Sequence, residues 1–192
     1  MKSQTSLSDD LRADAARNRA RVLEVARERL AAGDAELPMN TIARDAGVGV
    51  GTVYRHFPSR EALLESLAMG GFERLVVEAR KAADDDNPGA GLERLLRYGV
   101  RSQIEDVGLA AVLRSSGSAR AETSRLRGDL LEAVGRLLER AREAGAIRPG
   151  IGADDIRRLS CGIVYAVRVG DGDLDEIERY ADVLVDGIRP RS

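Results

Sequence analysis

The segment from residue 38 to residue 64 constrains the fold of this chain most, because it holds two short helical patterns around a glycine turn. Its sequence is PMNTIARDAGVGVGTVYRHFPSREALL. We expect helices over about 39–46 and 49–56, with Gly47 in the turn and Pro58 ending the second helix. This layout is typical of a helix-turn-helix, whose second helix enters the major groove of DNA. The segment therefore predicts binding to duplex DNA.

The second helix of this motif has an apolar side and a side suited to DNA. Val53 is spaced to pack inward, while Gly49 and Gly51 allow the backbone to come close to the duplex. The residues that can donate hydrogen bonds to phosphate oxygens are Thr52, Tyr54, His56 and Arg60. The alternative is that Tyr54 and His56 pack or hydrogen-bond within their own small domain. The clustering of donors favours the DNA-binding interpretation.

The composition of the 192 residues favours an all-α fold, and the net charge of the chain is small. Hydrophobic residues make up 43% and aromatic residues only 3%, while the helix formers Ala, Leu, Arg and Glu dominate. The net charge is -2, although residues 11–60 hold nine Arg against six acidic residues. We therefore expect DNA affinity to depend on the placement of a few cations.

Residue types that carry enzyme chemistry are scarce in this chain. Its one cysteine, Cys161, excludes an intrachain disulfide and is expected to be a small buried side chain, with a redox or intersubunit role as the alternative. His56 is the only histidine, and no phosphate loop or metal-ligand cluster appears. The acidic run from Asp84 to Asp86 is expected to be a solvated turn. We predict no enzymatic activity, no cofactor and no metal.

The apolar periodicity predicts about nine helices in two domains. Residues 8–58 form the expected three-helix helix-turn-helix domain, and residues 59–192 form a helical domain for effector binding and dimerisation. The later helices are expected over about 91–105, 107–114, 119–144, 153–170 and 173–189. The chain has neither an apolar segment typical of a signal peptide nor an apolar run long enough to span a membrane. We expect a cytoplasmic protein that does not contact membranes.

The last two helices each carry apolar residues at alternating steps of three and four. Heptad spacing on two antiparallel neighbours provides flat apolar faces that suit a four-helix interface between two subunits. The residues predicted to form this homodimer interface are Ile156, Leu159, Ile163, Leu174, Ile177, Ala181, Leu184 and Ile188. The alternative is that both faces meet the core of their own subunit.

The helix-turn-helix segment resembles that of the TetR-type (tetracycline-repressor-like) one-component regulators. The resemblance rests on Gly51-Thr52-Val53-Tyr54, His56-Phe57 and the run from Ser59 to Leu63, preceded by Ala46-Gly47-Val48. It is strong over residues 15–68 and architectural beyond them. It implies an all-α homodimer whose N-terminal helices bind a palindromic operator and whose C-terminal part binds a small effector that releases the DNA.

The resemblance also implies roles for individual residues. It places Val50, Gly51 and Arg55 near base edges in the major groove. It assigns phosphate contacts to Thr41, Thr52, Tyr54, His56 and Arg60. The chain departs from the family at Pro38, where Ser or Thr is common, and at Gly49-Val50, where Ser-Lys is common. Val50 is then expected to meet thymine methyl groups, and Arg55 remains as the main polar reader.

Arginines on the first helix offer further backbone contacts to DNA. Arg12, Arg17 and Arg19 are able to compensate for the missing lysine, or else they form a solvated helix face. The middle helices carry residues that suit an apolar effector cavity: Leu95, Tyr98, Arg101, Leu113, Leu130, Val134 and Tyr165. Arg97 and Gln103 would be further polar handles beside Arg101. An ordinary filled core is the alternative. The low aromatic content argues against a flat polyaromatic ligand.

The leading hypothesis is a dimeric, ligand-responsive transcriptional regulator, most simply a repressor, whose partners are an operator duplex and an unknown small-molecule effector. The alternative is an effector-independent helix-turn-helix protein that a protein partner controls. Both would bind DNA in the same way, but only the first needs a cavity for a small molecule.

Overall fold

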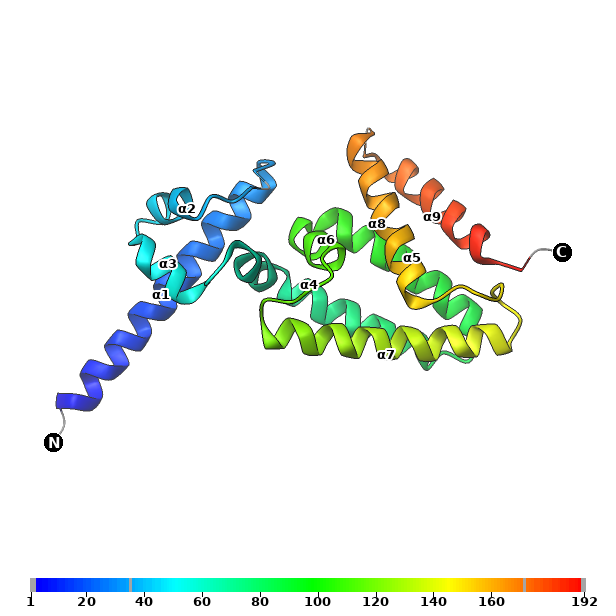
Figure 1. Ribbon diagram of the computed structural model, residues 1–192, viewed down its shortest axis with the longest axis horizontal. Helices are drawn as coiled ribbons and strands as arrows, with labels where there is room; N and C mark the ends of the chain where they lie inside the picture. The colour runs from blue at the N-terminus through cyan, green and yellow to red at the C-terminus, as the bar shows by residue number, and fades with distance from the viewer. Residues whose placement is uncertain (1–2, 35, 171, 191–192) are drawn as a thin grey trace. The chain divides into compact units, whose positions relative to one another are not determined.

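The computed structural model describes residues 3–34, 36–170 and 172–190, with side chains of the first helix described from residue 12 onward. These residues form nine helices and no strand, which confirms the expected all-α class (Figure 1). The helices are α1 Ser3–Ala31, α2 Met39–Asp45, α3 Val50–His56, α4 Arg60–Ala83, α5 Pro88–Glu105, α6 Val107–Arg114, α7 Ala121–Glu143, α8 Ala153–Val169 and α9 Leu174–Ile188. Among the described helices, none has the length and apolar character that crossing a membrane requires.

The chain divides into two compact units, Met1–Leu67 and Ala68–Ser192, and α4 continues from the first into the second. The expected domain boundary after residue 58 lies in the turn before α4. Ser59 caps this helix, because its hydroxyl accepts a hydrogen bond from the backbone N–H of Ala62 at 3.2 Å. The division into packing units itself falls later, within α4 after Leu67, so the first turns of α4 pack with the helix-turn-helix.

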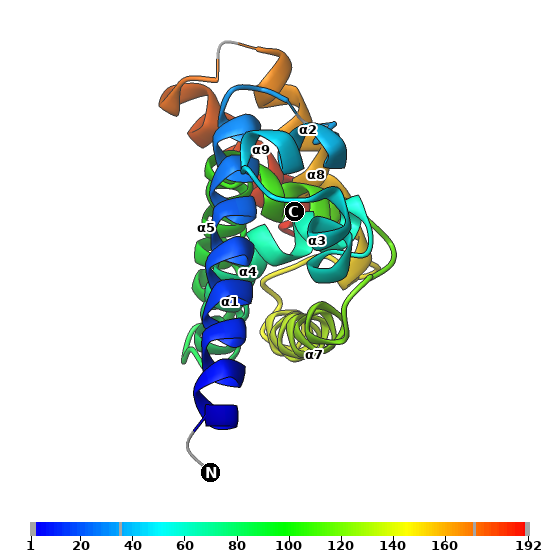
Figure 2. The same cartoon turned by 90° about the vertical axis from the view of Figure 1, so that its left-hand side faces the viewer.

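In the first unit, α2 and α3 pack against α1 (Figure 2). The core between them is fully buried and consists mainly of Val22, Ala26, Ile42, Val53 and Phe57. Val22 and Ala26 are four residues apart on α1, and Val53 of α3 is four residues before Phe57, so each pair lies on one side of its helical path. The inward role expected for Val53 is confirmed, and α3 can present its opposite side to the surface.

The turn between α2 and α3 depends on Gly47, which has a φ of 64°. This left-handed conformation is favourable for glycine and costly for residues with a Cβ atom. A Cβ atom at this position would also lie 2.9 Å from Nη2 of Arg21. Pro38 directly precedes α2 and has an extended backbone conformation. The turn fixes the angle at which α3 leaves α2.

In the second unit, α5 is the central helix and contacts α6, α7, α8 and α9. Its neighbours enclose a core of Leu, Val, Ile and Ala, with Phe72 of α4 fully buried in it. The helix begins at Pro88, earlier than the expected start near residue 91. The reason is that Asn87 caps it, since its side chain accepts a hydrogen bond from the N–H of Ala90 at 3.0 Å and Pro88 suits the first turn.

Candidate functional site

Helix α3 presents most of its predicted DNA-reading residues to the surface. Val50 is 42% exposed and Tyr54 is 46% exposed, and Gly51 and Arg55 are exposed as well. The structure thus brings the three predicted base-reading residues and Tyr54 to one accessible side, while Val53 faces the core.

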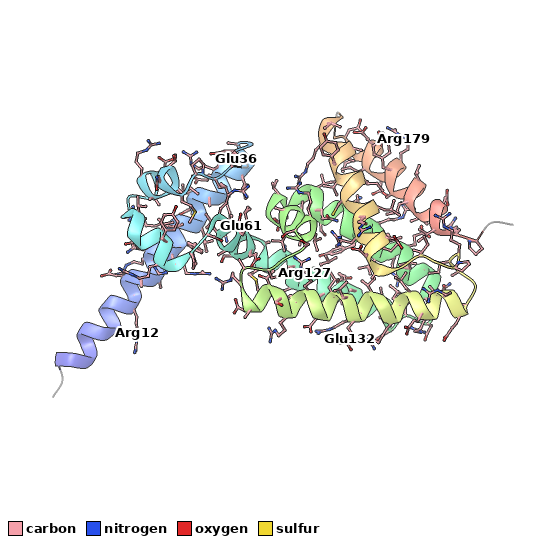
Figure 3. The ribbon with its side chains drawn as sticks, viewed as in Figure 1. Arg12, Glu36, Glu61, Arg127, Glu132 and Arg179 are labelled. Carbon is pink, nitrogen blue, oxygen red and sulfur yellow. The ribbon has the colours of Figure 1, made fainter. Side chains whose placement is uncertain are left out.

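The other predicted phosphate-contacting residues are half-buried. Thr41 of α2, Thr52 and His56 of α3, and Arg60 of α4 belong to this group. The His56 ring lies 6.2 Å from the Phe57 ring, centre to centre. Arg60 donates a hydrogen bond from Nε to the backbone oxygen of Glu36 at 2.7 Å, in the part of the first unit that Figure 3 labels by Glu36 and Glu61. A phosphate at Arg60 would therefore share a side chain that already binds the loop before α2.

The arginines of α1 divide into two groups. The guanidinium carbon of Arg19 lies 5.5 Å from the centre of the Phe57 ring, a distance typical of a cation–π contact. Arg19 therefore packs on the motif. Arg12 and Arg17 are exposed, and Arg17 pairs with Asp14 one turn earlier. The alternative to DNA contacts was that Arg12, Arg17 and Arg19 form a solvated helix face. The structure places Arg12 and Arg17 on such a face, but not Arg19.

The second unit contains a mainly apolar cavity of about 360 Å³. Its wall is formed by Leu75, Leu95, Leu96, Gly99, Gln103, Leu113, Ser115, Ser116, Arg127, Leu130, Leu131, Val134, Ala153, Asp154, Ile156, Arg157 and Ser160. Pockets of this size and lining are typical of sites for small apolar molecules. Helices α4 to α8 and the segment after α6 thus surround a space large enough for a ligand.

The structure separates the residues that were predicted for the effector pocket. Leu95, Leu113, Leu130 and Val134 line the cavity. Tyr98 and Arg101 instead line a different pocket beside Arg97 and Glu178. Tyr165 is 68% exposed on α8 and does not line the cavity. The helical pattern identifies apolar residues correctly, but it does not tell which side of α5 or α8 faces the cavity.

Charged residues of the cavity wall already bind other groups of the protein. Arg127, near the N-terminal end of α7 (Figure 3), donates from Nη2 to the backbone oxygens of Val112 at 2.9 Å and Gly117 at 3.2 Å. Arg157 donates from Nη2 to Oδ1 of Asp154 at 2.6 Å, and this hydrogen bond holds the pKa of Asp154 below its ordinary value. These contacts anchor the segment after α6.

Two polar residues, Gln103 and Ser160, line the cavity, and of these the sequence suggested Gln103 as a polar handle but not Ser160. Gln103 lies within α5 and Ser160 within α8, where single polar residues are common on solvated sides. Only the packing of α5 against α8 shows that both are buried. Their sequence carries no signal that separates them from exposed residues.

The apolar faces predicted for the dimer interface are largely covered by their own subunit. Ile177, Ala181, Leu184 and Ile188 of α9 are buried, and Ile156 and Ile163 pack against the same core. The four α9 residues are therefore covered by their own subunit, as the alternative expected, while Ile156 and Ile163 are half-buried. The remaining two, Leu159 and Leu174, are exposed.

A different side of α8 and α9 carries exposed apolar residues. Tyr165, Val169, Leu174 and Val183 are 66% to 69% exposed, more than the other large hydrophobic residues that the structure describes. We call the set Leu159, Gly162, Tyr165, Val169 and Val183 the α8–α9 outer face. Apolar side chains gathered on two adjacent helices are typical of a protein contact surface.

The remaining sequence candidates have structural surroundings of their own. Cys161 is partly buried, its thiol lies 3.7 Å from Oε1 of Gln103, and burial raises its pKa. In the run from Asp84 to Asp86, Asp85 accepts hydrogen bonds from the backbone N–H of Asn87 and from Arg94, which lower its pKa. Asp85 thus has partners within the protein at the end of α4.

An exposed α3 in a helix-turn-helix unit, joined to a helical unit with a cavity, defines a helix-turn-helix DNA-binding regulator. Residues 22–67 match the family model described as bacterial regulatory proteins, tetR family. Residues 87–190 match the model described as the C-terminal domain of SbtR-like transcriptional regulators. The chain belongs to the TetR family of transcriptional regulators, and this confirms both the resemblance and the prediction that it is not an enzyme.

Known proteins resemble the chain over nearly its whole length. A TetR transcription regulatory protein from Mycobacterium vanbaalenii is 39% identical, covers 94% of this chain and 99% of its own, and has a TM-score of 0.46. A TetR transcriptional regulator from Streptomyces coelicolor is 29% identical, covers 91% and 99%, and has a TM-score of 0.53. The HTH-type transcriptional regulator UidR of Escherichia coli K12 is 23% identical over 190 residues, which is 95% of each chain.

Proposed function

We propose that this protein is a dimeric repressor in the cytoplasm that binds a palindromic operator through α3 and leaves it when a small molecule occupies the cavity of the second unit. The observation that carries the proposal is the combination of an exposed α3 with an apolar cavity of about 360 Å³ in the same chain. The cavity favours control by a small molecule over the alternative of control by a protein partner alone.

In this proposal, the exposed side of α3 lies in the major groove. Val50 and Gly51 are small enough to bring the helix backbone close to base edges, and Val50 can contact a thymine methyl group. Arg55 supplies a bidentate donor for guanine. Tyr54 and Thr52 reach phosphate oxygens beside the groove, together with Thr41, His56 and Arg60 from the edges of the motif. The exposure of Tyr54 and Arg55 supports these roles.

The α8–α9 outer face is the proposed dimer interface. A palindromic operator requires two recognition helices related by a two-fold axis, so a second copy of this chain is the partner that fits. Gly162 has no described heavy atom within 4 Å of an added Cβ position, which leaves room for a partner helix to approach. Tyr165 and Val169 on α8 and Val183 on α9 would supply the apolar contacts.

Coupling between cavity and operator requires that the ligand favour one arrangement of the two recognition helices. α5 supports this coupling because it lines the cavity through Leu95, Leu96 and Gly99 and also contacts α9. On the same helix, Arg97 binds Glu178 at 3.1 Å and Asp182 at 2.5 Å on α9. A ligand that shifts α5 would therefore act on a helix of the outer face. Such coupling is typically worth ~1–3 kcal/mol.

The experiment that tests the proposal is selection of binding sites from a pool of random DNA duplexes by the full-length protein. We expect an enriched palindrome with half-sites about one helical turn apart, protected as one footprint. Recovery of unrelated sequences with no two-fold symmetry would contradict dimeric operator recognition. Transcription from a promoter that carries the selected site then distinguishes a repressor, which lowers it, from an activator.

A further inference from the structure

A hydroxyl in the cavity wall makes no hydrogen bond to the residues that the structure describes. Ser160 of α8 is 8% exposed and lines the cavity. Its side chain makes no hydrogen bond to any residue that the structure describes. Buried polar groups usually have a hydrogen-bond partner, and a group without one costs free energy. A ligand atom in the cavity is a natural partner for this hydroxyl.

A buried carboxamide lines the same cavity. Gln103 of α5 is 3% exposed, and its Nε2 donates to the backbone oxygen of Gly99 at 3.0 Å. Its Oε1 lies 3.7 Å from the thiol of Cys161, the residue that follows Ser160. A carboxamide nitrogen carries two N–H donors, so one donor of Gln103 remains after the bond to Gly99. Towards a ligand, Gln103 therefore offers an uncharged N–H donor, and Ser160 offers a hydroxyl that can donate or accept a hydrogen bond.

The ionised groups of the cavity wall already have partners within the protein. Asp154 binds the guanidinium of Arg157 through Nε at 2.9 Å and Nη2 at 2.6 Å, and it also binds Arg158 at 2.6 Å. Arg127 binds the backbone oxygens of Val112 in α6 and of Gly117 after it. An ionised ligand group placed against Ser160 would lose its hydration without gaining an ion pair of its own, which is unfavourable.

We propose that the ligand of this cavity is an uncharged, mainly apolar molecule with one hydroxyl or carbonyl oxygen that binds Ser160 and Gln103. At roughly 30 Å³ per non-hydrogen atom, a cavity of about 360 Å³ holds about a dozen such atoms. The apolar part lies against Leu95, Leu130 and Val134. This inference rests on the proposed function, because it names the chemical class of the effector.

The test compares three probes of equal chain length on the full-length dimer: 1-decanol, 2-decanone and decanoate. Dissociation constants are measured by isothermal titration calorimetry at neutral pH. We expect the alcohol and the ketone to bind at least about 10-fold more tightly than the carboxylate, because only the carboxylate must bury a charge. Equal or tighter binding of decanoate overturns the proposed ligand class.

Two variants test the named residues. Ser160→Ala and Gln103→Leu should each weaken 1-decanol binding by roughly 2- to 10-fold, which is the loss expected for one hydrogen bond. The matched control is Ser124→Ala, because Ser124 is exposed on α7 and does not line the cavity. Ser160→Ala should keep the unfolding temperature of the free protein, since its hydroxyl has no partner among the described residues. Unchanged affinity in both cavity variants overturns the role of these side chains.

A third variant separates failure of the ligand class from failure of the cavity as a ligand site. In Gly99→Ala, the added Cβ atom would lie 3.8 Å from Cδ1 of Leu75, so it fits without a clash and occupies part of the cavity. If Gly99→Ala weakens the binding of all three probes but decanoate is the tightest ligand of the wild type, only the proposed ligand class is overturned. Binding that Gly99→Ala leaves unchanged, or no binding of any probe, would overturn the cavity assignment, while operator selection would still report DNA recognition.

Discussion

Arg29 of α1 binds Asp45 at the C-terminal end of α2, with its Nε 3.1 Å from Oδ2 of Asp45. The same guanidinium donates from Nη1 to Oδ2 of Asp34 at 2.6 Å. The hydrogen bond from Arg29 holds the pKa of Asp45 below its ordinary value. This contact connects the long first helix to the helix-turn-helix, so it helps to fix the orientation of α2 and, through the Gly47 turn, of α3.

The Arg29–Asp45 contact predicts a pH dependence of stability. Because the pKa of Asp45 is lower in the folded protein than in the unfolded chain, its contribution to stability is present above the unfolded pKa and is lost as pH falls through the folded pKa. We expect Asp45→Asn to unfold at a lower temperature than the wild type near pH 7, and the difference to shrink below about pH 4. Thermal unfolding followed by circular dichroism measures this.

The control for this prediction is Asp14→Asn, which changes an exposed aspartate on α1. At each pH from 3 to 7, this variant should unfold at nearly the same temperature as the wild type, because exposed ion pairs contribute little to stability. A difference between wild type and Asp45→Asn that is the same at every pH would contradict the role of the ionised carboxylate.

Arg55→Ala should relax base preference at one position in each operator half-site. Loss of a bidentate contact to guanine is expected to cost roughly 1–3 kcal/mol on the preferred sequence and less on sequences that lack that base. Competition binding with single-base variants of the selected operator measures the effect. Arg27→Ala, at an exposed position on α1, is the control. Equal weakening on every sequence would show that Arg55 contacts phosphate and not a base.

Tyr54→Phe and His56→Ala should weaken DNA binding without changing the preferred sequence. Each variant removes one donor to a phosphate oxygen, and the expected cost is about 0.5–1.5 kcal/mol on all operators alike. Tyr54→Phe retains the ring, so its effect isolates the hydroxyl. The measurement is repeated site selection together with affinity on one fixed duplex. A changed consensus would assign these residues to base recognition.

Val169→Asp and Val183→Asp should each convert the dimer to a monomer that keeps its helical content. Both side chains are highly exposed in the subunit, so an added charge leaves the subunit core intact but cannot be buried in an interface. Analytical ultracentrifugation measures the oligomeric state, and operator affinity should fall with it. Val77→Asp changes a valine that is 45% exposed on α4 and serves as the control. Dimers that persist in both variants would exclude the α8–α9 outer face.

Leu184→Ala provides the opposite case on the same helix. Leu184 is buried in its own subunit, so truncation should lower the free energy of unfolding by roughly 2–5 kcal/mol and leave a cavity. Denaturant unfolding at several protein concentrations separates this loss from dimer dissociation, because a core defect shifts the midpoint equally at each concentration. A shift that appears only at low concentration would place Leu184 in the subunit contact.

Local features of the sequence determined the helices and the helix-turn-helix motif. The left-handed Gly47 and the hydroxyl of Ser59 act within a few residues of their own position, so they can be identified without the rest of the fold. The spacing of Val53 and Phe57 likewise shows which side of α3 is buried. The exposed side of α3 follows from these residues alone.

Only the tertiary structure decided which sides of α8 and α9 are buried and which residues line the cavity. Leu159 and Ile163 share a heptad pattern, yet Leu159 is exposed and Ile163 packs against the core. Both helices carry apolar residues on more than one side, so periodicity alone does not select a direction. That direction depends on contacts with α5, which is far away in the sequence, and the same contacts bury Ser160 beside the cavity.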